Sequence, residues 1–201
     1  MDRSQVKHLY YIAHLDNLTS IVKNGIICHN KVGKKRVVDI SNSAVQERRA
    51  AVRIPGINKP LHDFANLYFN PRNAMMFVRK DLHEELWVLG ISSSVLEMPN
   101  VVITDGNAAS GPTLFLDVPS GLAKLPRNGI MTKDWRDDDR IVMAEKRRVA
   151  CAEVLIPNKV EPSFFEEIYV SCTETKKRVT ELLGTHPLSE HVVKNAEMFF
   201  Q

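Results

Sequence analysis

The chain has 201 residues, of which 44% are hydrophobic and 25% are charged, and its formal net charge is +3. This length fits one domain over residues 1–201, and no run of about 18 apolar residues occurs, which excludes a simple membrane-spanning helix and a membrane partner. The small net charge does not by itself diagnose nucleic-acid binding. Cys28, Cys151 and Cys172 are odd in number and lack metal-like spacing, and residues 1–4 lack a signal peptide's apolar stretch. A reduced, cytoplasmic protein is therefore expected.

The first third of the chain predicts a short strand followed by two helices. The strand is the apolar run Tyr10–Ile12. Asp16 can cap the first helix, and Gly25 is placed to end it in a left-handed conformation. A polar loop over residues 31–36 leads to the second helix, which a serine can cap and which must stop before Pro55. That helix is expected from Ser41 or Ser43 through Val52.

The middle of the chain is rich in short apolar runs, which predict strands. These runs cover residues 66–70, 74–79, 85–91, 101–104 and 113–116. Residues 119–140 carry Pro, Gly and an acidic run around Trp135, a composition typical of a long functional or disordered loop. This stretch therefore separates the strand-rich middle from the C-terminal part.

The last third predicts two strands and a helix. Residues 149–156 form the clearest buried strand, and residues 167–172 form another. Thr173 can cap a helix that reaches residue 183 and stops at Gly184. Residues 192–200 fit either a strand or a helix. The pattern indicates an α+β fold with one or two packed, mainly antiparallel sheets and flanking helices. No glycine-rich phosphate loop follows a strand, which argues against a Rossmann fold or a P-loop.

Basic side chains gather in three clusters along the sequence. If the clusters share one face, they can hold a phosphate backbone, and if they are separate, they are ordinary solvated patches. The sequence leaves both interpretations open. The clusters are Lys31 with Lys34, Lys35 and Arg36; Arg48 with Arg49 and Arg53; and Lys146 with Arg147 and Arg148.

Glu153 is a single carboxylate inside the apolar run of residues 149–156. A carboxylate is costly to bury without a partner. Glu153 therefore either faces outward from a half-exposed strand or lies in a cleft with a chemical task. A carboxylate near a ribose can stabilise an oxocarbenium-like transition state and can take a proton from an attacking base nitrogen.

Five blocks of sequence, taken together and in order, resemble the DarT family of DNA ADP-ribosyltransferase toxins. The resemblance covers residues 9 to about 172. It implies an ADP-ribosyltransferase-like core that uses NAD+ as a substrate, needs no metal, and modifies thymine or guanine in single-stranded DNA with release of nicotinamide. It also implies a toxin–antitoxin system whose DarG-like macrodomain antitoxin removes the modification. The blocks are residues 9–18, 45–49, 61–64, 68–72 and 150–155.

The resemblance also implies roles for individual residues. Glu153 matches the catalytic glutamate. Arg49 matches the arginine that serves NAD+ and the reaction centre, where a guanidinium can clamp a pyrophosphate; on pattern alone it is equally a solvated helix arginine. The other expected NAD+-binding residues are Tyr10, Tyr11, Ile12, Thr19, Ile27 and Tyr68, and the expected DNA-binding residues are Arg72, Arg147 and Arg148.

Two histidines and one tyrosine need separate interpretation. Many family members carry a histidine at the position of Tyr11, which keeps a hydroxyl donor and a stacking face. His14 is expected to be a core histidine or to support the site indirectly, and His62 to be structural or substrate-orienting. The acceptor loop before Glu153 departs furthest from the family, at residues 110–112.

Two alternative functions remain open from the sequence. One is an ADP-ribosyltransferase that acts on RNA or protein. The other is a nucleic-acid-binding module without chemistry, which the basic clusters favour. NAD+ consumption in the presence of an oligonucleotide separates the second alternative from an enzyme.

Overall fold

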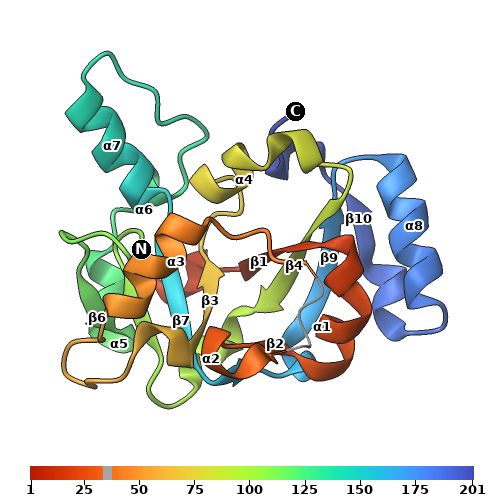
Figure 1. Ribbon diagram of the computed structural model, residues 1–201, viewed down its shortest axis with the longest axis horizontal. Coiled ribbons are helices and arrows are strands. Elements are labelled where there is room, and N and C mark those ends of the chain that lie inside the picture. The colour runs from red at the N-terminus through yellow and green to blue at the C-terminus, as the bar shows by residue number, and fades with distance from the viewer. Residues whose placement is uncertain (34–37) are drawn as a thin grey trace.

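The computed structural model describes residues 1–33 and 38–201, and within them the fold is built on one eight-stranded sheet (Figure 1). The strand order is β10-β9-β4-β1-β3-β7-β5-β6, and every described pair is antiparallel except β9 with β10. The strands are β1 (His8–His14), β3 (Phe64–Tyr68), β4 (Leu86–Ser92), β5 (Val102–Thr104), β6 (Phe115–Asp117), β7 (Glu153–Pro157), β9 (Phe165–Val170) and β10 (Val192–Lys194). A separate two-stranded ladder joins β2 (Ile26–Ile27) to β8 (Lys159–Val160).

Eight α-helices surround this sheet in the described residues. Figure 1 shows α8 beside β10 at one end, α3 in front of β3 and β7, and α7 projecting from the other end. The helices are α1 (Leu18–Asn24), α2 (His29–Val32), α3 (Ser43–Ala51), α4 (Ala74–Val78), α5 (Val118–Gly121), α6 (Arg127–Ile130), α7 (Arg140–Val149) and α8 (Thr173–Leu183). The expected α+β class is therefore observed.

The sheet consists of two well-paired halves that meet at one point. β1 pairs with β4 along its whole length, and β3 pairs with β7 from Phe64 to Tyr68. Between the two halves, the described register contains one pair, Tyr10 with Tyr68. Because β1 and β3 share so little of the ladder, they diverge beyond this pair and leave room for a cleft.

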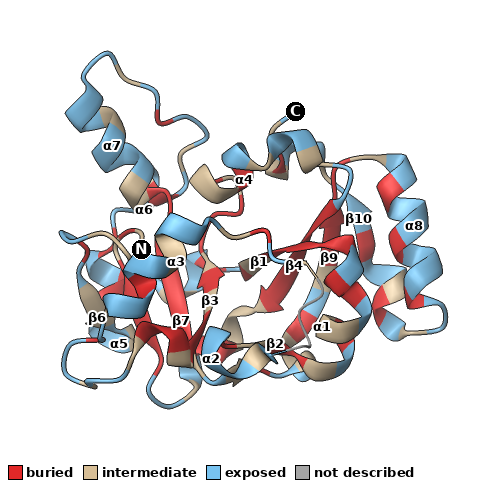
Figure 2. Cartoon of the chain, in the orientation of Figure 1, coloured by how far each residue is buried: buried red, intermediate tan, exposed pale blue. Residues whose placement is uncertain are grey.

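Strand β1 buries both of its faces, as its apolar sequence predicts. Leu9 and Ala13 belong to the main core, which also contains Trp87. Ile12 points to the opposite face and packs in a second core with Met76. Figure 2 shows the central strands buried and the outer helices largely exposed. The sheet is thus a rigid support for side chains at the cleft.

Two predicted elements are wrong. Residues 74–79 form α4 rather than a strand, because the side chain of Asn73 accepts hydrogen bonds from the backbone of Met75 and Met76 and caps a helix. The predicted strand over residues 149–156 begins only at Glu153. Val149, the first residue of the predicted strand, instead ends α7, a helix that Asp139 caps and that the sequence did not predict.

Gly25 ends α1 with φ of +84°, in agreement with the sequence prediction of a left-handed stop. A Cβ atom there would lie 2.3 Å from the carbonyl oxygen of Val160 in the β2–β8 ladder. We expect Gly25→Ala to lower the free energy of unfolding by about 2 kcal/mol or more, through strain and this clash. Gly184→Ala is the matched control in urea unfolding, since Gly184 also has positive φ but open space around it. Equal losses in both variants would contradict the expected clash.

Candidate active site

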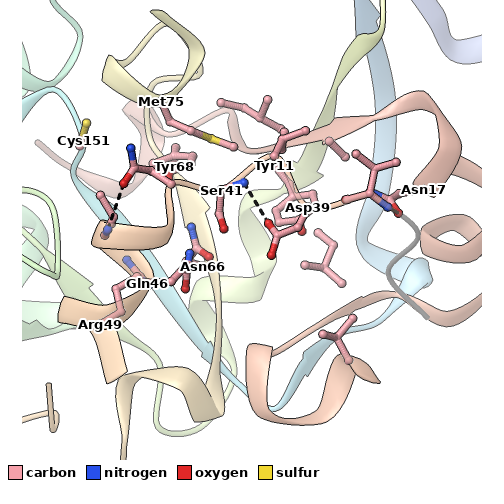
Figure 3. Close-up of a pocket in the computed structure, with 18 of the residues that line it drawn as sticks. Tyr11, Asn17, Asp39, Ser41, Gln46, Arg49, Asn66, Tyr68, Met75 and Cys151 are labelled. Atoms are coloured by element: carbon pink, nitrogen blue, oxygen red, sulfur yellow. Dashed lines mark hydrogen bonds between the residues drawn. The ribbon is translucent and has the colours of Figure 1, made fainter. Parts of the chain in front are cut away.

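A cleft of about 380 Å³ opens where β1 and β3 diverge, a volume typical of small-molecule sites. Strands β1 and β3 form one wall, and α1, α3 and α4 contribute the others. Figure 3 shows the side chains of Tyr11, Asp39, Arg49 and Tyr68 around this one cavity. Polar and aromatic groups from distant parts of the chain therefore converge at the gap in the sheet.

Arg49 and Glu153 form a buried ion pair at this cleft. The Nη1 atom of Arg49 lies 3.0 Å from both carboxylate oxygens of Glu153. Glu153 is 1% exposed, whereas Arg49 is 6% exposed and lines the cavity. The carboxylate thus lies behind the guanidinium, on the first residue of β7. The alternatives of an outward-facing glutamate and a solvated arginine are both excluded by this burial.

The loop after β5 holds the Glu153 carboxylate from the other side. The backbone N–H of Ala108 donates to Oε1 of Glu153 over 2.9 Å. The hydroxyl of Thr104 accepts from the backbone N–H of Glu153 at 2.9 Å and donates to the carbonyl of Gly106 at 2.7 Å. Two hydrogen-bond donors, Arg49 and Ala108, therefore fix one carboxylate in place.

Arg148 holds this loop in place rather than facing solvent. Its guanidinium pairs with Asp105 at 3.0 Å and with Glu145 at 2.7 Å, and it donates to the hydroxyl of Thr113 at 3.0 Å. These carboxylates raise the pKa of Arg148 further above its usual value. Gly106 leaves space for the guanidinium, since a Cβ there would lie 2.2 Å from Nη1. This geometry does not favour the predicted contact between Arg148 and DNA, because the guanidinium already pairs with two carboxylates.

Gly106→Ala is expected to lower kcat by about tenfold or more, because displacement of Arg148 shifts the loop that holds Glu153. The KM for NAD+, the substrate that the family resemblance implies, should change little, since Gly106 lies outside the cavity lining. Gly111→Ala in the same loop is the matched control, because a Cβ at Gly111 meets nothing within 4 Å. Steady-state kinetics of both variants check this, and an unchanged kcat in Gly106→Ala would refute the positioning role.

Tyr68 and Cys151 border the ion pair as neutral groups. Burial, followed by the negative charge of Glu153, raises the pKa of the Tyr68 hydroxyl well above its usual value. Burial also raises the pKa of the Cys151 thiol to about 11. Tyr68 can therefore donate a hydrogen bond at neutral pH, and Cys151 is a poor nucleophile.

The segment that follows residue 37 covers one side of the cleft, and two polar side chains hold it there. The side chain of Asn17 donates to the carbonyl of Val38 at 2.6 Å and accepts from its N–H at 3.1 Å. Arg79 donates to the carbonyls of Ile40 and Ser41 at 2.7 and 2.9 Å. The fixed segment places Asp39 in the cavity lining, a carboxylate that the sequence analysis did not single out.

The predicted NAD+-binding residues divide into two groups. Those that line the cavity are Tyr11, Ile12, Ile27, Arg49 and Tyr68. Tyr10 lies outside the lining, and its ring packs beside Tyr169 with ring centroids 6.3 Å apart. Thr19 is exposed on α1 and also lies outside, whereas the adjacent Ser20 lines the cavity.

The two other predicted DNA-binding arginines lie at the edge of the site. Arg147 is exposed on α7 and lines the cavity. Arg72 donates to the backbone carbonyls of Glu197 and Phe199, and its guanidinium carbon lies 3.9 Å above the ring of Phe200. The basic clusters do not form uniform surface patches, since Arg49 and Arg148 turn inward; Lys34, Lys35 and Arg36 lie outside the described residues.

Two predicted structural histidines have partners that fit that role. His14 is buried, and its Nε2 lies 2.9 Å from a carboxylate oxygen of Glu85. His62 lies 3.1 Å from the side-chain oxygen of Gln46, a cavity-lining residue, and stacks on His29 with ring centroids 4.2 Å apart. His62 therefore supports the cleft wall from behind.

Two features are absent from residues 1–33 and 38–201. No group of three or more His, Cys, Asp or Glu side chains is arranged to hold a metal ion. No helix is long and apolar enough to cross a membrane.

Comparison with known proteins gives concordant matches. The family model "ssDNA thymidine ADP-ribosyltransferase, DarT" matches residues 10–200. A DNA ADP-ribosyl transferase–DNA ADP-ribosyl glycohydrolase fusion protein of Thermosipho africanus is 33% identical over 96% of this chain, which spans 50% of that protein's length.

Two solved structures share the fold. Thermus sp. 2.9 DarT in complex with ADP-ribosylated ssDNA has a TM-score of 0.85 at 23% identity, covering 98% of this chain and 97% of that one. The same protein in complex with NAD+ has a TM-score of 0.80 at 22% identity, covering 98% of each chain. At this identity the likeness establishes the α+β architecture, including the mostly antiparallel sheet.

Proposed function

The chain belongs to the DarT family of ssDNA thymidine ADP-ribosyltransferases, and we propose that it transfers ADP-ribose from NAD+ to thymidine bases in single-stranded DNA. The observation that carries this proposal is the buried Arg49–Glu153 pair at the cleft between β1 and β3. The Thermus relative, whose structures hold NAD+ and ADP-ribosylated ssDNA, supports this choice of substrates. Unstacked bases in single-stranded DNA also present their edges without the cost of opening a duplex.

The cleft offers complementary groups for NAD+. Arg49 carries the positive charge that a pyrophosphate or a developing negative charge requires. Asp39 can accept hydrogen bonds from ribose hydroxyls, and Tyr11 presents a ring and a hydroxyl to the nicotinamide riboside. Because all three line one cavity, a single extended dinucleotide can contact them together.

In the proposed reaction, the bond between the ribose and nicotinamide breaks, and nicotinamide leaves with the electron pair. A thymine ring nitrogen forms the new bond to the ribose carbon and loses its proton. Glu153 stabilises the developing ribose cation and accepts that proton. Arg49 must loosen its contact with the carboxylate as the reactants enter, since Glu153 is otherwise 1% exposed. Every step uses groups of this chain and its two substrates.

The partner of this enzyme is proposed to be a DNA ADP-ribosyl glycohydrolase of the DarG type that reverses the modification. The support is the Thermosipho relative, which joins a transferase and a glycohydrolase in one protein. A toxin of a toxin–antitoxin system that acts in the cytoplasm fits this pairing, with residues 1–201 forming its transferase domain. Removal of ADP-ribose from DNA that this chain has modified is the direct test of such a partner.

A labelled-NAD+ assay with matched acceptors tests the proposed reaction. Single-stranded DNA that contains thymidine should become labelled, whereas the same sequence with every thymidine replaced by cytidine should not. RNA and protein acceptors in parallel test the first alternative function. Labelling of guanine-only DNA, or of RNA or protein above DNA, would overturn the thymidine assignment. Binding of DNA with no NAD+ consumption would instead favour a module without chemistry.

A further inference from the structure

A cluster of three aromatic rings lies outside the cavity, on the far side of α4. Phe77 packs edge-on against Trp135 and Phe200, with ring centroids 5.9 and 5.3 Å apart, and Trp135 lies 5.4 Å from Phe200. Trp135 is 8% exposed and serves as the base of the cluster, while Phe77 is 45% exposed. Phe200 is half-buried, so Phe77 is the exposed ring of the cluster and the other two rings support it.

The position of α4 connects this cluster with the cleft. Met75 and Val78 are three residues apart on α4, so they share one face, and both line the cavity. Phe77 points away from that face toward the loop before α7 and the C-terminal segment, which flank α4 in Figure 1. One helix, about 10 Å thick, therefore separates the cleft from the rings.

Cations border the rings. The guanidinium carbon of Arg72 lies 3.9 Å from the centroid of Phe200, and Nζ of Lys80 lies 5.5 Å from that of Phe77. The nearby carboxylate of Glu197 is paired with Lys133 at 2.9 Å. Aromatic faces combined with positive charge are the features that bind single-stranded nucleic acids, since bases stack and phosphates are neutralised.

We propose that Phe77, backed by Trp135 and Phe200, forms a platform on which a base flanking the target thymidine stacks. Arg72 and Lys80 would neutralise the neighbouring phosphates. This inference rests on the proposed function, because it concerns the strand that carries the target base. If this inference holds, the affinity for DNA depends on the length of the strand, through a surface outside the cavity that binds NAD+.

The test compares Phe77→Ala with the wild type on thymidine-containing single strands, using both labelling kinetics and fluorescence anisotropy. With an oligonucleotide long enough to flank the target on both sides, the variant should need about a fivefold or higher concentration for half-saturation. With a thymidine dinucleotide the two proteins should behave alike. The KM for NAD+ should be unchanged.

Two control variants make the comparison specific. Phe77→Trp restores a ring and should regain binding, whereas Leu182→Ala removes another exposed apolar side chain, 54% exposed on α8, and should have no effect. An unchanged affinity of Phe77→Ala for the long oligonucleotide would overturn the platform. If the wild type modifies no DNA at all, the proposed function fails. The platform is then tested separately, by the anisotropy comparison of DNA binding by Phe77→Ala and the wild type.

Discussion

Glu153→Gln is expected to lower the rate of ADP-ribosyl transfer to DNA by about 10²- to 10⁴-fold, the usual effect of removing a general base. Glutamine keeps the shape of the side chain and can still accept hydrogen bonds from Arg49 and Ala108. It cannot take a proton from thymine, and it offers no negative charge to the ribose cation. Single-turnover labelling of a thymidine oligonucleotide measures the loss.

The control for this variant is Glu161→Gln. Glu161 is exposed and pairs with Lys159 on the surface at 2.6 Å, so its loss should leave the rate unchanged. Both variants should unfold at nearly the wild-type temperature. Wild-type labelling by Glu153→Gln would remove Glu153 from the reaction, whatever its position in the cleft.

Arg49→Met is expected to abolish the activity and also to lower the free energy of unfolding by about 3–5 kcal/mol, because it leaves Glu153 buried without its partner. Glu153→Gln should lower the free energy of unfolding by less than Arg49→Met does. Arg49 lines the cavity, whereas Glu153 is 1% exposed. The double variant Arg49→Met with Glu153→Gln should regain most of the stability and none of the activity.

Urea unfolding and labelling of the two single variants and the double variant complete this cycle. Additive losses of stability would show that the pair is not coupled in the folded protein. Recovery of labelling in the double variant would contradict a direct role of either side chain. Arg48→Met is the matched control for stability, because Arg48 neighbours Arg49 on α3 but is exposed.

The sequence predicted the identity of the central pair but not its geometry. The family resemblance and the cost of burying a carboxylate both pointed to Glu153, and the family match over residues 10–200 confirms the resemblance. That Arg49 would screen Glu153 from the cavity depends on where α3 packs against β7, which local sequence patterns do not encode. The roles of both residues stay predictions until the variants are measured.

Elsewhere, local sequence patterns failed to predict secondary structure at positions where a single side chain determines it. Apolar residues 74–79 have strand-like composition, yet the cap at Asn73 turns them into α4. The predicted loop ended at residue 140 and Lys146, Arg147 and Arg148 suggested a basic patch, yet residues 140–149 form α7 and Arg148 folds inward onto Asp105. Period-two alternation on β1 separates Tyr10 from Tyr11, so adjacent tyrosines of one motif face different cores.

Mass spectrometry of a single-stranded oligonucleotide containing one thymidine, after incubation with the protein and NAD+, tests the central claim most directly. We expect a mass increase of one ADP-ribosyl group, located on the thymidine by fragmentation, with one nicotinamide released for each modified strand. The increase should be absent with Glu153→Gln. Unmodified DNA despite NAD+ consumption, or an ADP-ribosyl group on another base, would contradict it.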